Sequence, residues 1–103
     1  MIEGRLLMES LRIGADLVVP GLRVARLARV DVSGSVSATQ PDVWGFVDFE
    51  AGDELADELA EALAAVLRIE DGWWADFTVG DDHVVVFAGK VFRYRKGDSA
   101  ARE

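Results

Sequence analysis

The fold is decided by residues 53–68, which read DELADELAEALAAVLR. Apolar side chains recur at helical spacing and would form one stripe: Leu55, Leu59, Ala62, Leu63 and Val66. The acidic side chains would lie on the opposite, outer side: Glu54, Asp57, Glu58 and Glu61. The pair Asp71-Gly72 favours a stop shortly after this segment. The stretch therefore predicts one amphipathic helix with an acidic outer surface.

Strand-like segments flank the helix on both sides. Residues 43–50 (VWGFVDFE) are apolar on both faces until Asp48, which is typical of a strand inside a sheet. Three more strands are predicted after the helix, at residues 73–79, 83–88 and 91–96. Because one crossover helix joins the strands before and after it, those two strands should be parallel. We expect an α+β fold in two layers, with a mostly antiparallel sheet of about five or six strands and one helix packed across one face.

Two turns set the expected pairing of the last three strands. A three-residue loop at 80–82 pairs Val79 with His83, and a turn at Gly89-Lys90 pairs Phe87 with Phe92. Both pairings would put six side chains on the face that the helix covers: Trp73, Phe77, Val85, Phe87, Phe92 and Tyr94.

The N-terminal part reads as extended chain around a turn. Pro20-Gly21 predicts a type II turn between extended segments at 12–19 and 22–33, the second with a β-bulge near Ala25–Arg26. Residues 33–42 read as a loop, and residues 97–103 as a polar tail. Residues 2–5, Ile-Glu-Gly-Arg, match a protease site used to remove fusion tags. Two interpretations of residues 1–7 stay open: a tag remnant or disordered segment with Met8 as the natural start, or an authentic N-terminus that matches by chance. No chemistry is placed on them.

Composition narrows the class of protein. The 103 residues fit one domain, 1–103, and the absence of cysteine excludes disulfides, thiolate metal sites and a cysteine nucleophile. The formal net charge is −8, and residues 48–82 carry twelve acids against one base, which disfavours nucleic acid as a partner. No apolar run is long enough to span a bilayer and no signal peptide is visible, so we expect no membrane association and a cytoplasmic location.

One helix covers one face of a sheet, which leaves the other face to be explained. In the expected register that face is both apolar and basic, which is typical of interface hot spots. Its candidate partner-binding residues are Trp74, Val84, Val86, Val91, Arg93 and Arg95. Three explanations remain open: the N-terminal strands fold over this face, strong curvature of the sheet hides it, or another chain docks there, as in a homodimer or a complex with a protein partner.

Few residues suggest catalysis or metal binding. His83 is the only histidine and is expected to be an ordinary residue at a strand end. The acids from Asp48 to Asp82 match no metal-binding loop, so we expect no metal and no cofactor. A pocket between helix and sheet, lined by Trp73, Phe77 and Tyr94, would be the ligand site of an alternative, small-ligand-binding protein or minor enzyme.

Residues 72–77 (GWWADF) and 84–98 (VVVFAGKVFRYRKGD) resemble the C-terminal part of a family of short, uncharacterised bacterial α+β proteins. The resemblance covers about the last third of the chain and implies no activity, cofactor or catalytic residue. The function expected from the residues is a non-enzymatic interaction module that self-associates through a sheet face. A second alternative is an acidic inhibitor or immunity-type protein that binds a basic partner through the acidic helix surface.

Overall fold

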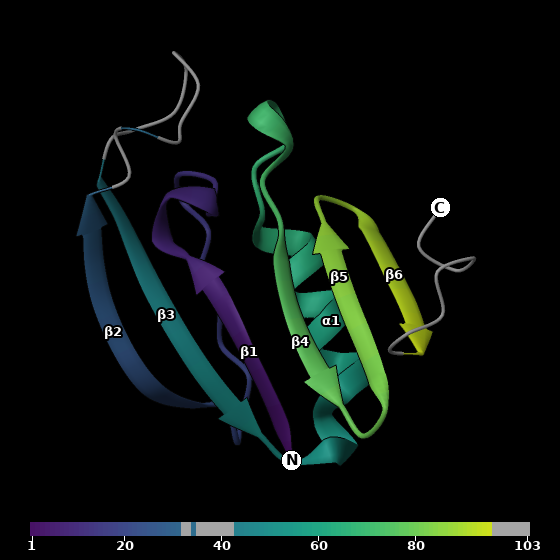
Figure 1. The fold of residues 1–103 in the computed structure, drawn as a ribbon. Helices are drawn as coiled ribbons and strands as arrows, with labels where there is room; N and C mark the ends of the chain where they lie inside the picture. The colour runs from purple at the N-terminus through teal and green to yellow at the C-terminus, as the bar shows by residue number, and fades with distance from the viewer. Residues whose placement is uncertain (32–33, 35–42, 96–103) are drawn as a thin grey trace.

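The computed structural model describes residues 1–31, 34 and 43–95, and all structural statements concern these residues. The strands are β1 (Ile2–Leu7), β2 (Arg23–Asp31), β3 (Val43–Ala51), β4 (Ala75–Val79), β5 (Asp82–Phe87) and β6 (Lys90–Arg95). The helix α1 (Ala56–Val66) continues the short 3₁₀ turn η2 (Asp53–Leu55), and two more such turns are η1 (Met8–Ser10) and η3 (Glu70–Gly72). The strands form one antiparallel sheet in the order β2-β3-β1-β4-β5-β6 (Figure 1). The predicted α+β fold with a single crossing helix is confirmed.

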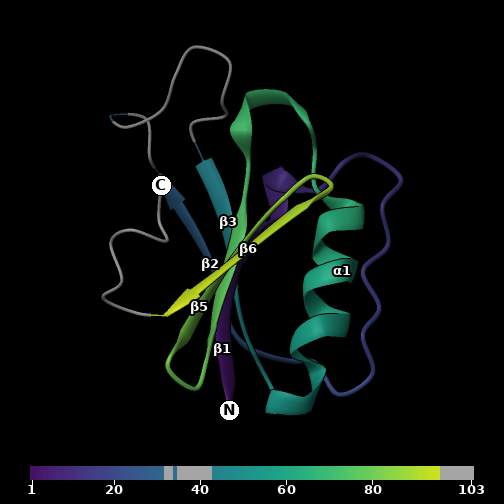
Figure 2. The same ribbon diagram turned by 90° about the vertical axis from the view of Figure 1, so that its right-hand side faces the viewer.

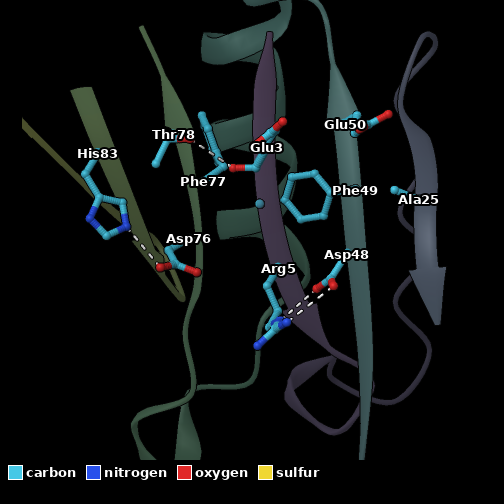
Figure 3. A pocket seen from close by; sticks show the side chains of 11 residues that line it. Glu3, Arg5, Ala25, Asp48, Phe49, Glu50, Asp76, Phe77, Thr78 and His83 are labelled. Carbon is cyan, nitrogen blue, oxygen red and sulfur yellow. Dashed lines mark hydrogen bonds and ion pairs between the residues drawn. The ribbon is translucent and has the colours of Figure 1, made fainter. Parts of the chain in front are cut away.

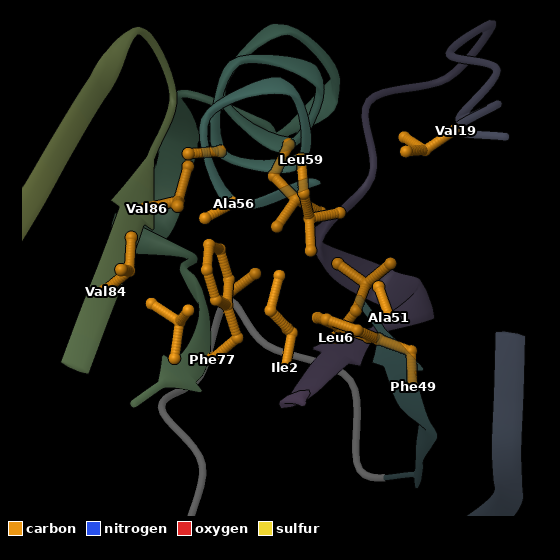
Figure 4. Packing of buried hydrophobic residues seen from close by; sticks show 14 of the residues in the cluster. Ile2, Leu6, Val19, Phe49, Ala51, Ala56, Leu59, Phe77, Val84 and Val86 are labelled. Carbon is orange, nitrogen blue, oxygen red and sulfur yellow. The ribbon is translucent and has the colours of Figure 1, made fainter. Parts of the chain in front are cut away.

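The helix and the segment between β1 and β2 form the second layer, on one face of the sheet (Figure 2). The core between the layers is apolar, and its largest fully buried side chains include Phe77, Ile2, Leu59 and Leu63 (Figure 4). The predicted stripe of α1 supplies Leu59 and Leu63, because they lie four residues apart and so share one face of the helix. Val19, from the segment before β2, belongs to the same core.

β3 and β4 are both antiparallel to β1, which lies between them, so they are parallel to each other as predicted for strands joined by a crossover helix. β3 is also an internal strand, as expected from its apolar sequence.

The expectation that residues 1–7 are disordered is wrong. Residues 2–7 form β1, which is hydrogen-bonded to β3 on one side and to β4 on the other. Ile2 and Leu6 point into the core, whereas Glu3 and Arg5 point away from it. This alternation of apolar and polar side chains is typical of a half-buried strand. It is visible in the sequence, in the same residues that match the protease site.

The segment at 12–19 is not a strand, contrary to the prediction. It instead packs beside α1 and satisfies carbonyl groups at the C-terminal end of that helix. The Arg12 guanidinium donates to the Ala65 carbonyl at 3.2 and 3.0 Å, and the Arg12 amide donates to the Val66 carbonyl at 2.9 Å. The turn at Pro20-Gly21 is confirmed by a φ of +94° at Gly21 and the hydrogen bond that closes it. The bulge predicted near Ala25 is also present, whereas the loop predicted at 33–42 and the tail at 97–103 lie outside the described residues apart from Gly34.

The expected strand register is wrong by one residue between β4 and β5. Val79 pairs with Asp82 rather than with His83, because the connecting turn has two residues and not three. Between β5 and β6 the register differs from the prediction by two residues, so that Phe87 pairs with Lys90 and not with Phe92. Because side chains alternate, a shift of two residues does not change which side chains of β5 and β6 share a face. Since side chains alternate, the single-residue slip reverses the β5–β6 hairpin relative to β4.

Two partner-binding candidates are therefore core residues: Val84 and Val86 are only 1% and 0% exposed beneath α1. Val91, Arg93 and Arg95 pair with Val86, Val84 and Asp82, so they lie on the helix side of β6. Arg93 accordingly approaches Asp57 of α1 at 3.9 Å and donates to Asp82 at 2.8 Å. Side chains that were expected beneath the helix lie instead on the opposite face: Val85, Phe87, Phe92 and Tyr94. The predicted patch does not exist as one surface.

Candidate functional site

The candidate site is the face of the sheet opposite α1, which we call the open face. None of the described elements lies over it (Figure 2). The explanation in which N-terminal strands fold over this face does not hold for the described chain, because β1 and β2 are strands of the same sheet.

Strand pairing arranges the side chains of the open face in three rows across the sheet. The charged row runs Arg26, Asp48, Arg5, Asp76, Val85 and Phe92. The polar row runs Arg23, Glu50, Glu3, Thr78, His83 and Tyr94. The apolar row contains Ala28 of β2, Phe46 of β3, Leu7 of β1 and Phe87 of β5, and it ends at Lys90 of β6. The face thus changes from apolar to polar along the strands.

Charges alternate in sign along the first four positions of the charged row. Arg5 donates to both carboxylate oxygens of Asp48, at 2.7 and 3.3 Å, and Arg26 approaches the same carboxylate at 3.5 Å. Hydrogen bonding from Arg5 lowers the pKa of Asp48, and the reciprocal interaction raises the pKa of Arg5. The Arg5 guanidinium also lies 4.8 Å from the centre of the Phe46 ring, a cation–π distance. Arg5 therefore joins the charged row to the apolar row.

The polar row contains one position where like charges face each other. Glu3 is directly opposite Glu50, an arrangement that disfavours the pairing of β1 with β3. Arg23 of β2 compensates by donating to the Glu50 carboxylate. Next along the row, the Thr78 hydroxyl donates to the Glu3 carbonyl at 3.4 Å.

His83 lies near the start of β5, at a strand end as predicted, and is part of a chain of hydrogen bonds. Its Nε2 is 2.9 Å from Asp76 Oδ2, and its Nδ1 is 2.9 Å from the Tyr94 hydroxyl. In the neutral ring that fits both contacts, Nε2–H donates to the carboxylate and the phenol donates to Nδ1. The carboxylate orients the ring, but all three side chains satisfy one another, and the described residues place no serine, threonine or lysine nucleophile in this chain of hydrogen bonds.

A groove of about 470 Å³ runs over the centre of the open face (Figure 3). Its polar side chains come from both the charged and the polar row, and Ala25 at the bulge of β2 closes one side. Among the described residues, no group of three acids or histidines is arranged to hold a metal ion. The charges of the groove are matched mostly within the protein, which suits a surface that meets another polar surface better than a site for a single ion.

The sequence-predicted pocket residues are not brought together. Phe77 lies in the core and is 1% exposed. Tyr94 lies on the open face with His83, and Trp73 packs edge-on against Trp44 with ring centres 5.2 Å apart. Glu3 and Arg5 belong to the site although the protease-site match of residues 2–5 gives no sign of it. The alternation of residues 2–6 was the available signal.

Exposed aromatic side chains lie near the apolar end of the open face. Phe92 is 50% exposed and its ring packs edge-to-face with Phe87 at 5.9 Å. Trp74, immediately before β4, is 51% exposed, so it remains a candidate for partner binding.

Comparison with protein-family models, with curated proteins and with solved structures found no match to this chain. The resemblance to short bacterial proteins stays a prediction. Within the described part of the chain, no helix has the length and apolar character needed to cross a membrane.

Proposed function

We propose that this protein is a non-enzymatic interaction module that self-associates by stacking the open faces of two copies. The observation that carries the proposal is an uncovered sheet face with matched rows of apolar, charged and polar side chains. Half-exposed Phe92 gives this face a large apolar contact, and aromatic and arginine side chains are the residue types that dominate interface energies.

The order of side chains along the rows favours one symmetry. A twofold axis parallel to the strands, between β1 and β4, would place Arg5 of one copy over Asp76 of the other. In the polar row the same axis would place Glu50 over His83 and Arg23 over Tyr94, and in the apolar row it would place Phe46 over Phe87. A twofold axis that crosses the strands along the charged row would instead place Arg5 over Arg5 and Asp48 over Asp48. The first arrangement sets Arg5 against Asp76 and Phe46 against Phe87 and brings no like charges together, so it is the expected one.

The area of the open face sets the expected affinity of the dimer. Six strands spaced by ~4.8 Å span ~29 Å, and six residues at ~3.3 Å span ~20 Å. Each copy then contributes ~580 Å², and the pair buries ~1,200 Å², which is at the lower end for stable complexes. We therefore expect a dimer that dissociates on dilution.

The test uses two adjacent residues of β6 with similar exposure on opposite faces of the sheet. Phe92 is 50% exposed on the open face and Val91 is 44% exposed on the helix side. Phe92→Arg should make the protein monomeric in sedimentation equilibrium, because the proposed axis places this position over Arg26 of the other copy, whereas Val91→Arg should dimerise like the parent. A parent chain that is monomeric at every concentration refutes the proposal, and so does dissociation by Val91→Arg alone.

The acidic surface of α1 supports a second candidate, a basic protein partner. The Asp57 side chain is 98% exposed and only Arg93 approaches it, at 3.9 Å, among the described basic residues. Binding through this surface should weaken steeply with added salt, because exposed charges are screened within about 8–10 Å at physiological ionic strength. Such binding would be unaffected by Phe92→Arg.

A further inference from the structure

The two edges of the sheet are formed by β2 and β6 (Figure 1). The outer side of an edge strand leaves backbone N–H and C=O groups unpaired, which makes it a template for another extended chain. Among the described residues, no strand pairs with the outer side of β6. The regularity and the charges of each edge strand decide whether it accepts such a chain.

The edge at β2 is protected. Its register against β3 shifts between Val24 and Arg26, which is a β-bulge that interrupts regular pairing. Two arginines of this strand are also engaged by carboxylates of β3, since Arg23 donates to Glu50 and Arg26 approaches Asp48. We therefore do not expect β2 to accept another strand.

The edge at β6 is regular, exposed and basic. Its six residues pair with β5 without a register shift, and five of them are exposed. The strand carries Lys90, Arg93 and Arg95 and no acid, although the formal net charge of the chain is −8. Arg93 is engaged by Asp82, but Lys90 and Arg95 form no ion pair within the part of the chain that the structure describes. Unpaired backbone groups and unneutralised positive charge thus occur on the same edge.

The charge of β6 selects the occupant of this edge. Pairing with the β6 of a second copy would bring two basic strands within ~4.8 Å of each other, and like charges across strands are destabilising. An acidic strand instead meets Arg93 and Arg95 with opposite charge, on the helix side that these arginines share. Every second side chain of that strand lies beside Phe92 and Tyr94, where an apolar group fits.

We propose that β6 binds an acidic, extended segment of another protein as an added strand of the sheet. The acidic side chains of the segment lie on the helix side, and its apolar side chains lie on the side of the open face. Backbone hydrogen bonds supply affinity in this mode of binding, and alternate side chains supply specificity. The inference goes beyond self-association, because stacking of the open faces does not use the outer side of β6.

The probe for the test is a fluorescent peptide in which Glu and Val alternate over six residues, the length of β6. Its anisotropy should rise to saturation as the protein is added, and binding should weaken with added salt because exposed charges are screened. A peptide with Lys in place of each Glu should bind far more weakly. A peptide with Pro in place of each Val keeps every acid but loses half of its N–H donors, so it should also bind far more weakly.

Arg95→Gln should weaken binding of the Glu-Val peptide roughly threefold, the scale of one exposed ion pair. Arg29→Gln is the matched control, because Arg29 is exposed on the other edge strand and forms no ion pair among the described residues. It should leave binding unchanged. The proposal is overturned if the Glu-Val peptide shows no saturable binding, if the Lys or Pro peptide binds as well, or if Arg29→Gln weakens binding as much as Arg95→Gln.

Discussion

Gly4→Ala should be among the most destabilising small substitutions in this protein. A Cβ added at Gly4 would lie 2.5 Å from the Asp76 carbonyl oxygen, 2.5 Å from Phe77 Cβ and 2.6 Å from the end of the Phe49 ring. Two of these atoms are fixed by the backbone of β4, so rotation of a side chain cannot relieve the clash. β1 would have to move away from β4 in the centre of the sheet.

Overpacking a well-packed core costs about 1–3 kcal/mol, and the two rigid neighbours on β4 place this case near ~3 kcal/mol. With a urea dependence of ~1.5 kcal/mol per molar, the unfolding midpoint should fall by ~2 M. Urea unfolding followed by circular dichroism measures it. The total stability of a domain is only about 5–15 kcal/mol, so the loss is a large fraction.

Gly45→Ala in β3 is the matched control. Its nearest neighbour would be Met8 Cγ at 3.3 Å, part of a flexible, exposed side chain that can move. We expect a change within ~1 kcal/mol, because alanine also lowers the entropy of the unfolded chain. If Gly4→Ala were as stable as the parent, or no worse than Gly45→Ala, the position of β1 between β3 and β4 would be refuted.

Three further substitutions test other contacts. Since Arg5 depresses the folded-state pKa of Asp48, this carboxylate stabilises the protein above its unfolded pKa of ~3.9 and loses that effect as the pH falls through the folded value. Acid unfolding curves of Asp48→Asn should therefore be flatter than those of the parent below pH ~4. Tyr94→Phe removes the hydroxyl 2.9 Å from His83 Nδ1, so it should cost ~1 kcal/mol in urea unfolding and shift the imidazole NMR signals; unchanged signals would contradict the hydrogen-bonded chain. Arg12→Ala removes two hydrogen bonds to a carbonyl of the last helical turn and should cost ~1 kcal/mol, with faster amide exchange confined to that end of α1.

The turns show why the strands were easier to predict than their register. Hydrophobic alternation predicted each strand of the last hairpins, and Gly80 and Gly89 predicted the two turns. Both glycines have the positive φ that such turns require, +56° and +72°. A loop of two or of three residues around Gly80 fits the same sequence. The two loop lengths differ in which side chains of β5 face α1: Val84 and Val86 with two residues, Val85 and Phe87 with three. Packing of the helix against the sheet selects the first set, which is buried.

The candidate site depended even more on long-range pairing. His83 was visible as the only histidine, but its two partners come from β4 and β6, seven and eleven residues away. Arg5 and Asp48 are 43 residues apart and meet only because β1 inserts beside β3. No local pattern encodes that insertion.

The sequence by itself determined the helix, the positions of most strands, the turn at Pro20-Gly21 and the bulge near Ala25. These features follow from local periodicity and from the backbone preferences of proline and glycine. Only the tertiary structure decided the place of β1, the register of the last hairpins and the rows on the open face. The physical reason is that a strand shows which of its side chains alternate, but the neighbouring strand and the covering helix determine which set is buried.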